Sequence, residues 1–499
     1  RLLVLCVCLA GPGVASAQPL DTDPAAERLW SDIERVLKRD CNGTTRIGLK
    51  MYSLERRTSL LAKNSDQLFT PASNQKMITS VMALKRVGPD YRFYTRLYTD
   101  GYIEGSTLKG DLYIKGFGDP WLVTEQMWLL VNALRNLPVT RVEGRVIADN
   151  HFFEDQRRVA TWANYNGSEA YLAPMGALSF NFNTVTVHVE PAQEAGLPPV
   201  VVVDPATDYI TVRNTARTVN GLSDHERLIV NRLPRQNHDE IIVAGTLPKT
   251  MARKKYYLNV TDPQWYTLHA FRENLEQAGV EVTGGLERGY VPDNARLLVE
   301  HESPPLADIL RGLNKFSNNF IAEQILRTLA ADVYGPPGTT ENGVKLLHAY
   351  MEGLGYSAGQ YNMVDGSGLS RQNKVSPDQI VAVLENAYND LSIFPEFIAA
   401  LGVMGIDGSV EDRMNGNRHA QKIRAKTGTL NHVSALSGYF QSMDGERFAF
   451  SILLNDMKCS NGKAMKLEDD ILDLALHFKR SEGGREDESA EPGPASINP

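Results

Sequence analysis

The sequence predicts an α+β fold in which both ends of the chain build one domain, an antiparallel sheet flanked by helices, and a large β-rich module is inserted into it. Two observations predict this arrangement. Helix and strand patterns occur up to residue 88 and again after residue 291, whereas residues 89–290 are dominated by short strands and turns. At 499 residues, the chain is long enough for two or three domains.

The first part of the outer domain is predicted to span residues 18–88. It begins with a helix over 23–39, because Asp23-Pro24 supplies the residue types preferred at N-cap and N1. Residues 46–52 alternate as a half-buried strand should. A second helix starts near Ser73 and ends at Gly88, and its apolar stripe is expected to face the core.

The inserted module is predicted to span residues 89–290 and to form two subdomains. Its short apolar or alternating runs predict strands at 93–98, 111–114, 145–148, 183–189, 200–203, 209–212 and 240–245. Helical patterns interrupt this texture only at 123–137 and 265–278.

The second part of the outer domain is predicted to span residues 291–480. Helices are expected at 306–313, 319–331, 343–354, 376–388, 396–401 and 467–479. Strands are expected at 422–430, 434–441 and 447–454. A short joint without helical character separates the first two helices.

The two ends of the chain have special compositions. Residues 1–17 combine a basic residue, an apolar run and Ala15-Ser16-Ala17, which is typical of a secretory signal cleaved after Ala17. Since residue 1 is not Met, we expect part of this signal to be missing. No other apolar run is long enough to cross a bilayer, so the mature chain is expected to be secreted or periplasmic. Residues 481–499 are predicted to be a disordered acidic tail.

The net charge of −8 gives no reason to expect a polyanionic partner, so no nucleic acid is expected. Two cysteines, Cys41 and Cys459, remain after the predicted signal. Cys41 precedes the first predicted strand and Cys459 follows the last. If these strands are antiparallel neighbours, a disulfide is geometrically allowed. Two free buried thiols are the alternative.

A serine and a lysine three residues apart, Ser73 and Lys76, open the second predicted helix. Residues at i and i+3 share a helical face, so the amine can serve as the base that a serine nucleophile needs. The alternative is a serine that only caps the helix. The motif S-x-x-K also occurs at Ser106, in a predicted hairpin, and at Ser460, beside an Asn-Gly turn signal.

Two further short runs carry chemistry. Ser317-Asn318-Asn319 fits S-x-N and lies at the joint between two helices, where side chains can point into a cleft. Lys426-Thr427-Gly428 lies on a predicted edge strand. There the lysine can attract a carboxylate, the threonine can bind it, and the glycine can let an extended peptide approach. Each run also has a purely structural interpretation: residues 317–319 as a helix joint, and residues 426–428 as part of an ordinary strand. Another S-x-N, at Ser179, starts a strand and is read as structural.

Together and in this order, S-x-x-K, S-x-N and K-T-G resemble the motifs of the serine penicillin-recognising acyltransferases. The large insert and the runs 110–120 and 365–371 are similar to those of class C low-molecular-mass penicillin-binding proteins of the peptidase S13 type. The resemblance implies a transpeptidase domain like that of penicillin-binding proteins and β-lactamases. It also implies a serine D-alanyl-D-alanine carboxypeptidase or endopeptidase that acts on bacterial peptidoglycan and is inhibited by β-lactams.

The resemblance also implies roles for individual residues. Ser73 would be acylated, Lys76 would take its proton, Ser317 would relay a proton to the leaving amine, and Asn319 would hold Lys76 and the substrate. Lys426 would lower the pKa of Lys76. The oxyanion hole would be formed by the backbone N–H groups of Ser73 and Thr429. Substrate binding would involve Thr427, Gly428, Thr429, Asp149 and Arg371, with the last two at the diamino acid of the stem peptide.

The resemblance implies stem peptides and β-lactam antibiotics as partners. No cofactor is expected. No metal is expected either, because the sequence contains no zinc-binding motif. The sequence allows a homodimer without indicating one. A β-lactamase would acylate in the same way, but the insert and the missing class A Glu-x-x-Leu-Asn run argue against it. A Ser-His-Asp hydrolase lacks its G-x-S-x-G elbow here, and an idle wall-binding protein would not need a serine beside an amine.

Overall fold

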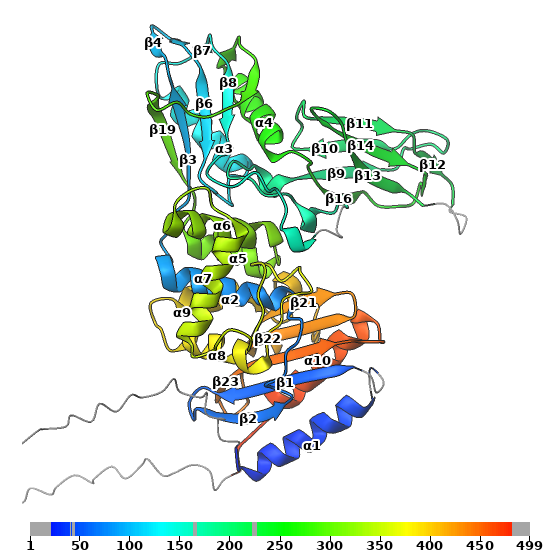
Figure 1. The fold of residues 1–499 in the computed structure, drawn as a ribbon. Helices are drawn as coiled ribbons and strands as arrows, with labels where there is room; N and C mark the ends of the chain where they lie inside the picture. Colours follow the sequence, from blue (N-terminus) through cyan, green and yellow to red (C-terminus); the bar gives the residue numbers. More distant parts are fainter. Residues whose placement is uncertain (1–20, 40, 42–44, 163–166, 222–226, 482–499) are drawn as a thin grey trace, which may run out of the picture.

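The computed structural model describes residues 21–39, 41, 45–162, 167–221 and 227–481, and Figure 1 shows its α+β fold. The predicted signal, 1–17, and the predicted tail beyond residue 481 lie outside the described residues. No described helix is long and apolar enough to span a bilayer.

A six-stranded antiparallel sheet is built from both ends of the chain. Its spatial order is β2 (Thr58–Lys63), β1 (Arg46–Ser53), β23 (Arg447–Asn455), β22 (Val433–Gln441), β21 (Ile423–Leu430) and β20 (Gly402–Val403). Since β20 has only two residues, it pairs with β21 only at Arg424 and Ala425. Beyond Ala425, toward Leu430, β21 therefore has an open edge.

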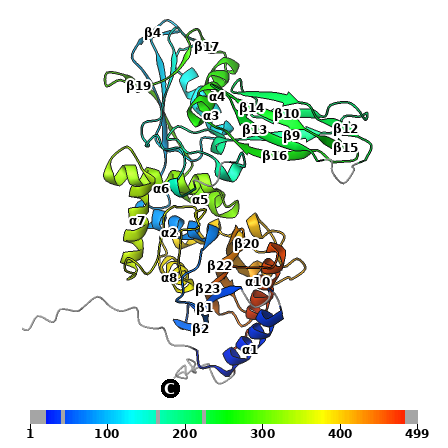
Figure 2. The same ribbon diagram turned by 45° about the vertical axis from the view of Figure 1, so that its right-hand side comes forward.

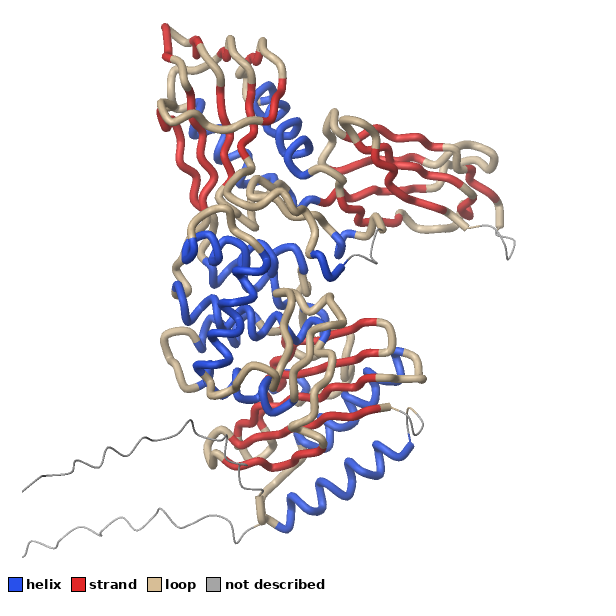
Figure 3. The backbone as a smooth tube through the Cα atoms, in the orientation of Figure 1, coloured by secondary structure: helices blue, strands red, loops and turns tan. Residues whose placement is uncertain are grey.

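Helices cover both faces of this sheet (Figures 1 and 3). One face carries α1 (Pro24–Arg39) and α10 (Asn461–Leu476), which pack on each other. The other carries an all-helical layer: α2 (Gln75–Val87), α5 (Leu306–Lys315), α6 (Asn319–Tyr334), α7 (Thr340–Gly353), α8 (Pro377–Tyr388) and α9 (Phe394–Ala400). In this layer α2 is central: its residues 75–84 are all buried. Each fully buried large apolar side chain contributes about 1.5–3 kcal/mol, so the start of α2 is firmly fixed.

The inserted chain forms two lobes beyond the helical layer (Figures 1 and 2). The first contains a five-stranded sheet in the order β18 (Leu286–Arg288), β8 (Val146–Asp149), β6 (Leu112–Gly116), β3 (Tyr94–Thr99) and β19 (Arg296–Glu302). A smaller sheet follows the order β17 (Glu281–Val282), β7 (Arg141–Val142), β5 (Thr107–Lys109) and β4 (Tyr102–Glu104). The helices α3 (Thr124–Arg135) and α4 (Pro263–Gln277) pack with them.

The second lobe consists of strands alone. One sheet has the order β10 (Val200–Asp204), β9 (Thr184–Glu190) and β16 (Lys254–Asn259), and another β11 (Ile210–Asn214), β14 (Asp239–Ala244) and β13 (Ile229–Pro234). A third pair is β12 (Arg217–Val219) with β15 (Thr246–Pro248). Apolar residues of both lobes belong to one buried cluster.

Two sequence-based boundaries need correction. The insert does not end at residue 290, because β19 pairs with β3 inside the insert's own sheet. The chain returns to the helical layer only at α5. At Ser460, the Asn-Gly pair does not form a turn after a strand. The Ser460 hydroxyl instead accepts a hydrogen bond from the Lys463 N–H and caps α10, which therefore starts at Asn461 rather than near 467.

The structure joins Cys41 and Cys459 in a disulfide, with 4.9 Å between their Cα atoms. Cys41 precedes β1, and Cys459 follows β23, its antiparallel neighbour. The bridge therefore links the two chain ends at one end of the sheet.

We expect the Cys41→Ser, Cys459→Ser double variant to be less stable by about 2–4 kcal/mol, because the disulfide restricts a very long loop in the unfolded chain. The urea midpoint of the transition that reports the six-stranded sheet should fall. Reduction of the unaltered protein should lower it equally, and reduction of the double variant should have no effect. An unchanged midpoint after reduction would show that the bridge adds no stability.

Candidate active site

Ser73 lies in a short 3₁₀ turn, Ala72–Asn74, directly before α2 rather than at its N-cap. Ala72 has a φ of 47°, a conformation that costs a non-glycine residue energy. Neighbouring glycines hold this turn closely. A Cβ on Gly368 would lie 1.9 Å from the Ala72 carbonyl oxygen, and one on Gly428 would lie 3.0 Å from the Ser73 nitrogen. The strained turn is thus fixed from two sides.

Lys76 lies within the first turn of α2 and is fully buried. Its Nζ has three oxygen partners: Ser73 Oγ at 2.9 Å, Asn319 Oδ1 at 2.6 Å and the carbonyl of Ser367 at 2.7 Å. The amine therefore connects three separate segments of the chain at the serine.

The joint between α5 and α6 supplies the second motif. Ser317 has a φ of 57°, and this left-handed turn lets its Oγ accept a hydrogen bond from Lys426 Nζ at 2.7 Å. Asn319, the first residue of α6, bonds Lys76 with its oxygen and donates from Nδ2 to the carbonyl of Tyr171 in the insert. Strain at a non-glycine residue often accompanies a functional site.

The third motif lies on the open edge of β21. Lys426 is fully buried and shares one face of the sheet with Arg424, the face that packs toward the helical layer. The Thr427 hydroxyl donates to Ser409 Oγ at 2.6 Å. A Cβ on Gly428 would meet the Pro71 carbonyl at 2.8 Å. This glycine thus brings β21 against the Ser73 turn, a reason that the sequence did not reveal.

These residues surround a cleft of about 520 Å³. Its lining residues are Ser73, Tyr171, Ser317, Asn319, Gly368, Leu369, Thr427, Thr429, Leu430, Asn431 and Asn461. All three sequence motifs therefore open into one space.

Burial lowers the pKa of Lys76 to about 7, although the carboxylates of Asp365 and Glu323 act in the opposite direction. Burial, together with the nearby Lys76, also lowers the pKa of Lys426 well below its usual value. Both lysines are thus biased toward the neutral amine. A neutral amine next to a serine hydroxyl can accept its proton.

Two buried carboxyl groups behind Lys76 were not predicted. Glu323, one turn after Asn319 on α6, accepts the backbone N–H groups of Gly366 and Ser367 at 3.0 and 2.8 Å. Asp365 accepts from the backbone of Gly368 and from Trp162 Nε1. The two carboxyl groups fix the loop whose Ser367 carbonyl binds Lys76. Burial and Asp365 raise the pKa of Glu323 to about 7.

One predicted substrate residue is not in the cleft. Asp149 is fully buried at the end of β8, where its carboxylate bonds Lys115, His151 and the Val291 N–H. It does not line the cleft and has no surface to offer a ligand. The predicted contact of Asp149 with the stem peptide is therefore withdrawn. Arg371, in contrast, is exposed and donates to the carbonyl of Asn431, a cleft residue.

Among the described residues, side chains that could together bind a metal ion lie close to one another only in the insert, at Asp208, His269 and Glu273. Arg272 donates to the Asp208 carboxylate at 2.8 Å, and Glu273 accepts from the Asp208 N–H. None of these residues lines the cleft.

Comparison with known proteins identifies the family. The sequence profile of the D-Ala-D-Ala carboxypeptidase 3 (S13) family matches residues 29–475. The chain belongs to this family. It is accordingly a serine-type D-Ala-D-Ala carboxypeptidase and a penicillin-binding protein by class.

Individual relatives of this S13 carboxypeptidase cover most of its length. A D-alanyl-D-alanine carboxypeptidase of Actinomadura is 31% identical over 456 residues, 88% of this chain and 84% of the relative. The carboxypeptidase DacB of Haemophilus influenzae is 25% identical over 85% of this chain and 88% of its own. The crystal structure of penicillin-binding protein 4 from H. influenzae superposes with a TM-score of 0.77, at 22% identity, over 89% of this chain and 99% of that one. The predicted fold class is confirmed.

We expect Gly428→Ala to reduce the rate at which D-alanine is released from a D-Ala-D-Ala peptide by about 100-fold, because its Cβ must displace β21 or the Ser73 turn. Gly462→Ala is the matched control, since a Cβ there meets nothing within 4 Å. Equal activity of both variants would show that this close approach does not position the cleft.

Proposed function

We propose that this carboxypeptidase acts on peptidoglycan stem peptides through an acyl-enzyme on Ser73, as a D-alanyl-D-alanine carboxypeptidase and endopeptidase. The observation that carries the proposal is the hydrogen bond between the buried amine of Lys76 and the Oγ of Ser73, at 2.9 Å. Such a pair is the arrangement of a nucleophile with its general base. In this mechanism Ser73 attacks the carbonyl between two D-alanines while Lys76 takes the hydroxyl proton.

The leaving amine needs a proton. Ser317 is the donor in this proposal, because its hydroxyl borders the cleft and is held by Lys426. The proton that Lys76 takes from Ser73 replaces the one that Ser317 gives to the leaving amine, so the step balances. The terminal D-alanine, or the neighbouring strand at a cross-link, then leaves. Water next hydrolyses the ester at Ser73.

The oxyanion hole of the proposal consists of the Ser73 and Thr429 N–H groups. The direction of the β21 backbone supports Thr429. The Ile423 carbonyl accepts the N–H of Met404, just after β20, at the outer edge, and every second residue of a strand has the same orientation. The N–H of Thr429 therefore points away from β22 and toward the open edge. Loss of one such donor costs about 2.7–4 kcal/mol in other enzymes.

The substrate lies along the open edge of β21 and adds a strand to it. The Thr427 and Thr429 hydroxyls bind its terminal carboxylate, beside the amine of Lys426. Gly428 leaves room for the backbone, and Arg371, at the outer end of the cleft, binds the polar end of the diamino acid. A β-lactam presents an analogous carboxylate and amide, so it acylates the same serine. The H. influenzae relative was crystallised in a complex with a β-lactam.

The proposed location is the periplasm or the outer cell surface of a bacterium, where peptidoglycan is accessible. The apolar segment within residues 1–17 supports export.

Purified cross-linked and monomeric muropeptides provide the test. We expect loss of one D-alanine from monomeric pentapeptides and conversion of cross-linked dimers to monomers, both measured by mass spectrometry. Ser73→Ala should abolish both activities, whereas Ser179→Ala, in the unrelated S-x-N run, should retain them. Full activity of Ser73→Ala would refute the proposal.

A fluorescent penicillin should form a long-lived adduct with Ser73 that survives denaturing electrophoresis. Lys76→Ala should slow labelling by at least about 100-fold, because it removes the base. Rapid turnover of the antibiotic without a stable adduct would instead indicate a β-lactamase.

The rate of labelling should rise as the pH increases through about 7, because Lys76 is an ammonium below its lowered pKa and a neutral base above it. In Glu323→Gln the midpoint should move to lower pH, because a carboxylate that raises the pKa of Lys76 is lost. The glutamine oxygen can still accept the two loop N–H groups. Glu27→Gln, on the exposed side of α1, should leave the midpoint unchanged. An unchanged midpoint in Glu323→Gln would exclude this coupling.

A further inference from the structure

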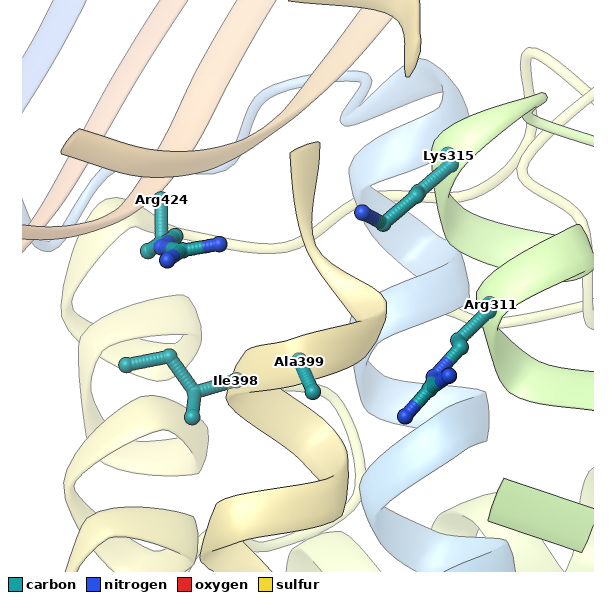
Figure 4. Close-up of a pocket in the computed structure, with 5 residues that line it drawn as sticks. All are labelled: Arg311, Lys315, Ile398, Ala399 and Arg424. Atoms are coloured by element: carbon teal, nitrogen blue, oxygen red, sulfur yellow. The ribbon is translucent and has the colours of Figure 1, made fainter. Parts of the chain in front are cut away.

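A second pocket, of about 330 Å³, lies between β21, α5 and the C-terminal end of α9. It shares no lining residue with the cleft. Its lining residues are Arg311, Lys315, Ile398, Ala399 and Arg424. Figure 4 shows Arg424 on one side and the two cations of α5 on the other, with the last turn of α9 between them. Three cationic side chains thus border one small space.

The protein neutralises these charges only in part. Lys315 Nζ donates to Asp407, whose other oxygen accepts the N–H of Val403. Within the described chain, the guanidinium of Arg424 makes no hydrogen bond and no ion pair within 4 Å, although its charge also acts on the carboxylate of Asp407. Arg311 lies 3.7 Å from Asp308 in an exposed pair, which contributes little. Together the three cations, Asp407 and Asp308 leave a local excess of one positive charge at the pocket.

This excess does not follow from the general composition. The chain carries a net charge of −8, so a group of cations facing one pocket is a local feature. Like charges at short range repel one another, and the apolar wall of Ile398 and Ala399 reduces screening by water. The guanidinium of Arg424 makes no hydrogen bond within the described chain, and that of Arg311 meets only the exposed Asp308, although each can bind an oxyanion through two parallel hydrogen bonds. The pocket therefore has unsatisfied capacity for an anion.

We propose that this pocket binds a phosphate group, held by Arg424, Arg311 and Lys315. A phosphate group is negatively charged, and its tetrahedral oxygens can accept from the two guanidinium groups and the ammonium that border the pocket. The proposal does not depend on the chemistry at Ser73.

The pocket lies close to the catalytic motifs. Lys315 precedes Ser317 by two residues, and Arg424 precedes Lys426 by two residues on the same face of β21. Two residues along a strand span about 6.6 Å. An anion bound at Arg424 would therefore lie near the hydrogen bond between Ser317 and Lys426 without entering the cleft.

Titration calorimetry of the whole protein tests the proposal with inorganic phosphate as the probe, at an ionic strength kept constant with sodium chloride. We expect saturable binding to the unaltered protein and at least tenfold weaker binding to Arg424→Gln. Arg35→Gln, which removes an exposed arginine of α1, should bind as the unaltered protein does. Equal affinity in Arg424→Gln, or no saturable heat in the unaltered protein, would overturn the proposal.

Glycerol 1-phosphate, tested in parallel, distinguishes the source of the phosphate. Binding of both compounds indicates a site for phosphate esters, and binding of inorganic phosphate alone indicates a site for the free ion; either result supports the proposal. If Arg424→Gln does not fold, as judged by circular dichroism, Arg311→Gln replaces it, because that side chain is 58% exposed and removable without a cavity. Binding is measured without turnover, so an inactive enzyme would not affect this test.

Discussion

The structure of the site depends on one buried amine. Lys76 has lost all contact with water, and its three oxygen partners, together with the nearby carboxylates of Asp365 and Glu323, compensate for that loss. Each partner comes from a different segment: the turn before α2, the start of α6 and the loop after Asp365. Displacement of any one of them would leave a buried polar group unpaired, at a cost of about 1–3 kcal/mol. The requirement to satisfy this amine therefore holds the three segments in register.

The insert is part of this support, although it belongs to separate lobes. The carbonyl of Tyr171 fixes the amide of Asn319, and Trp162 Nε1 bonds the carboxylate of Asp365. Arg327, buried on α6, donates to the carbonyl of Gln156 at 2.7 Å. The segment between the two lobes thus closes one wall of the cleft and orients the groups that contact Lys76. Changes in the lobes can reach the chemistry through this segment.

The sequence predicts those features that are written in short spacings. Ser73 with Lys76 and Ser317 with Asn319 are each close in the chain and lie where a helix begins, so the short motifs alone bring each pair together. Glu323 and Asp365 were missed because they act on Lys76 only through a loop, which no local pattern reveals. Asp149 was wrongly assigned, since the end of a strand does not show on which side its carboxylate finds partners. The strand β19 was missed because its sequence, RLLVEHE, lacks a clear alternation.

The pairing of β1 with β23 has a consequence for how the chain folds during synthesis. A ribosome or an export channel delivers β1 long before its partner strand, so the emerging chain exposes an unpaired, apolar edge for most of its synthesis. Lys426, the lysine of the third motif, is also synthesised late. A chain that stops before β21 lacks Lys426 and the edge strand of the cleft, so premature termination before that point yields no hydrolase.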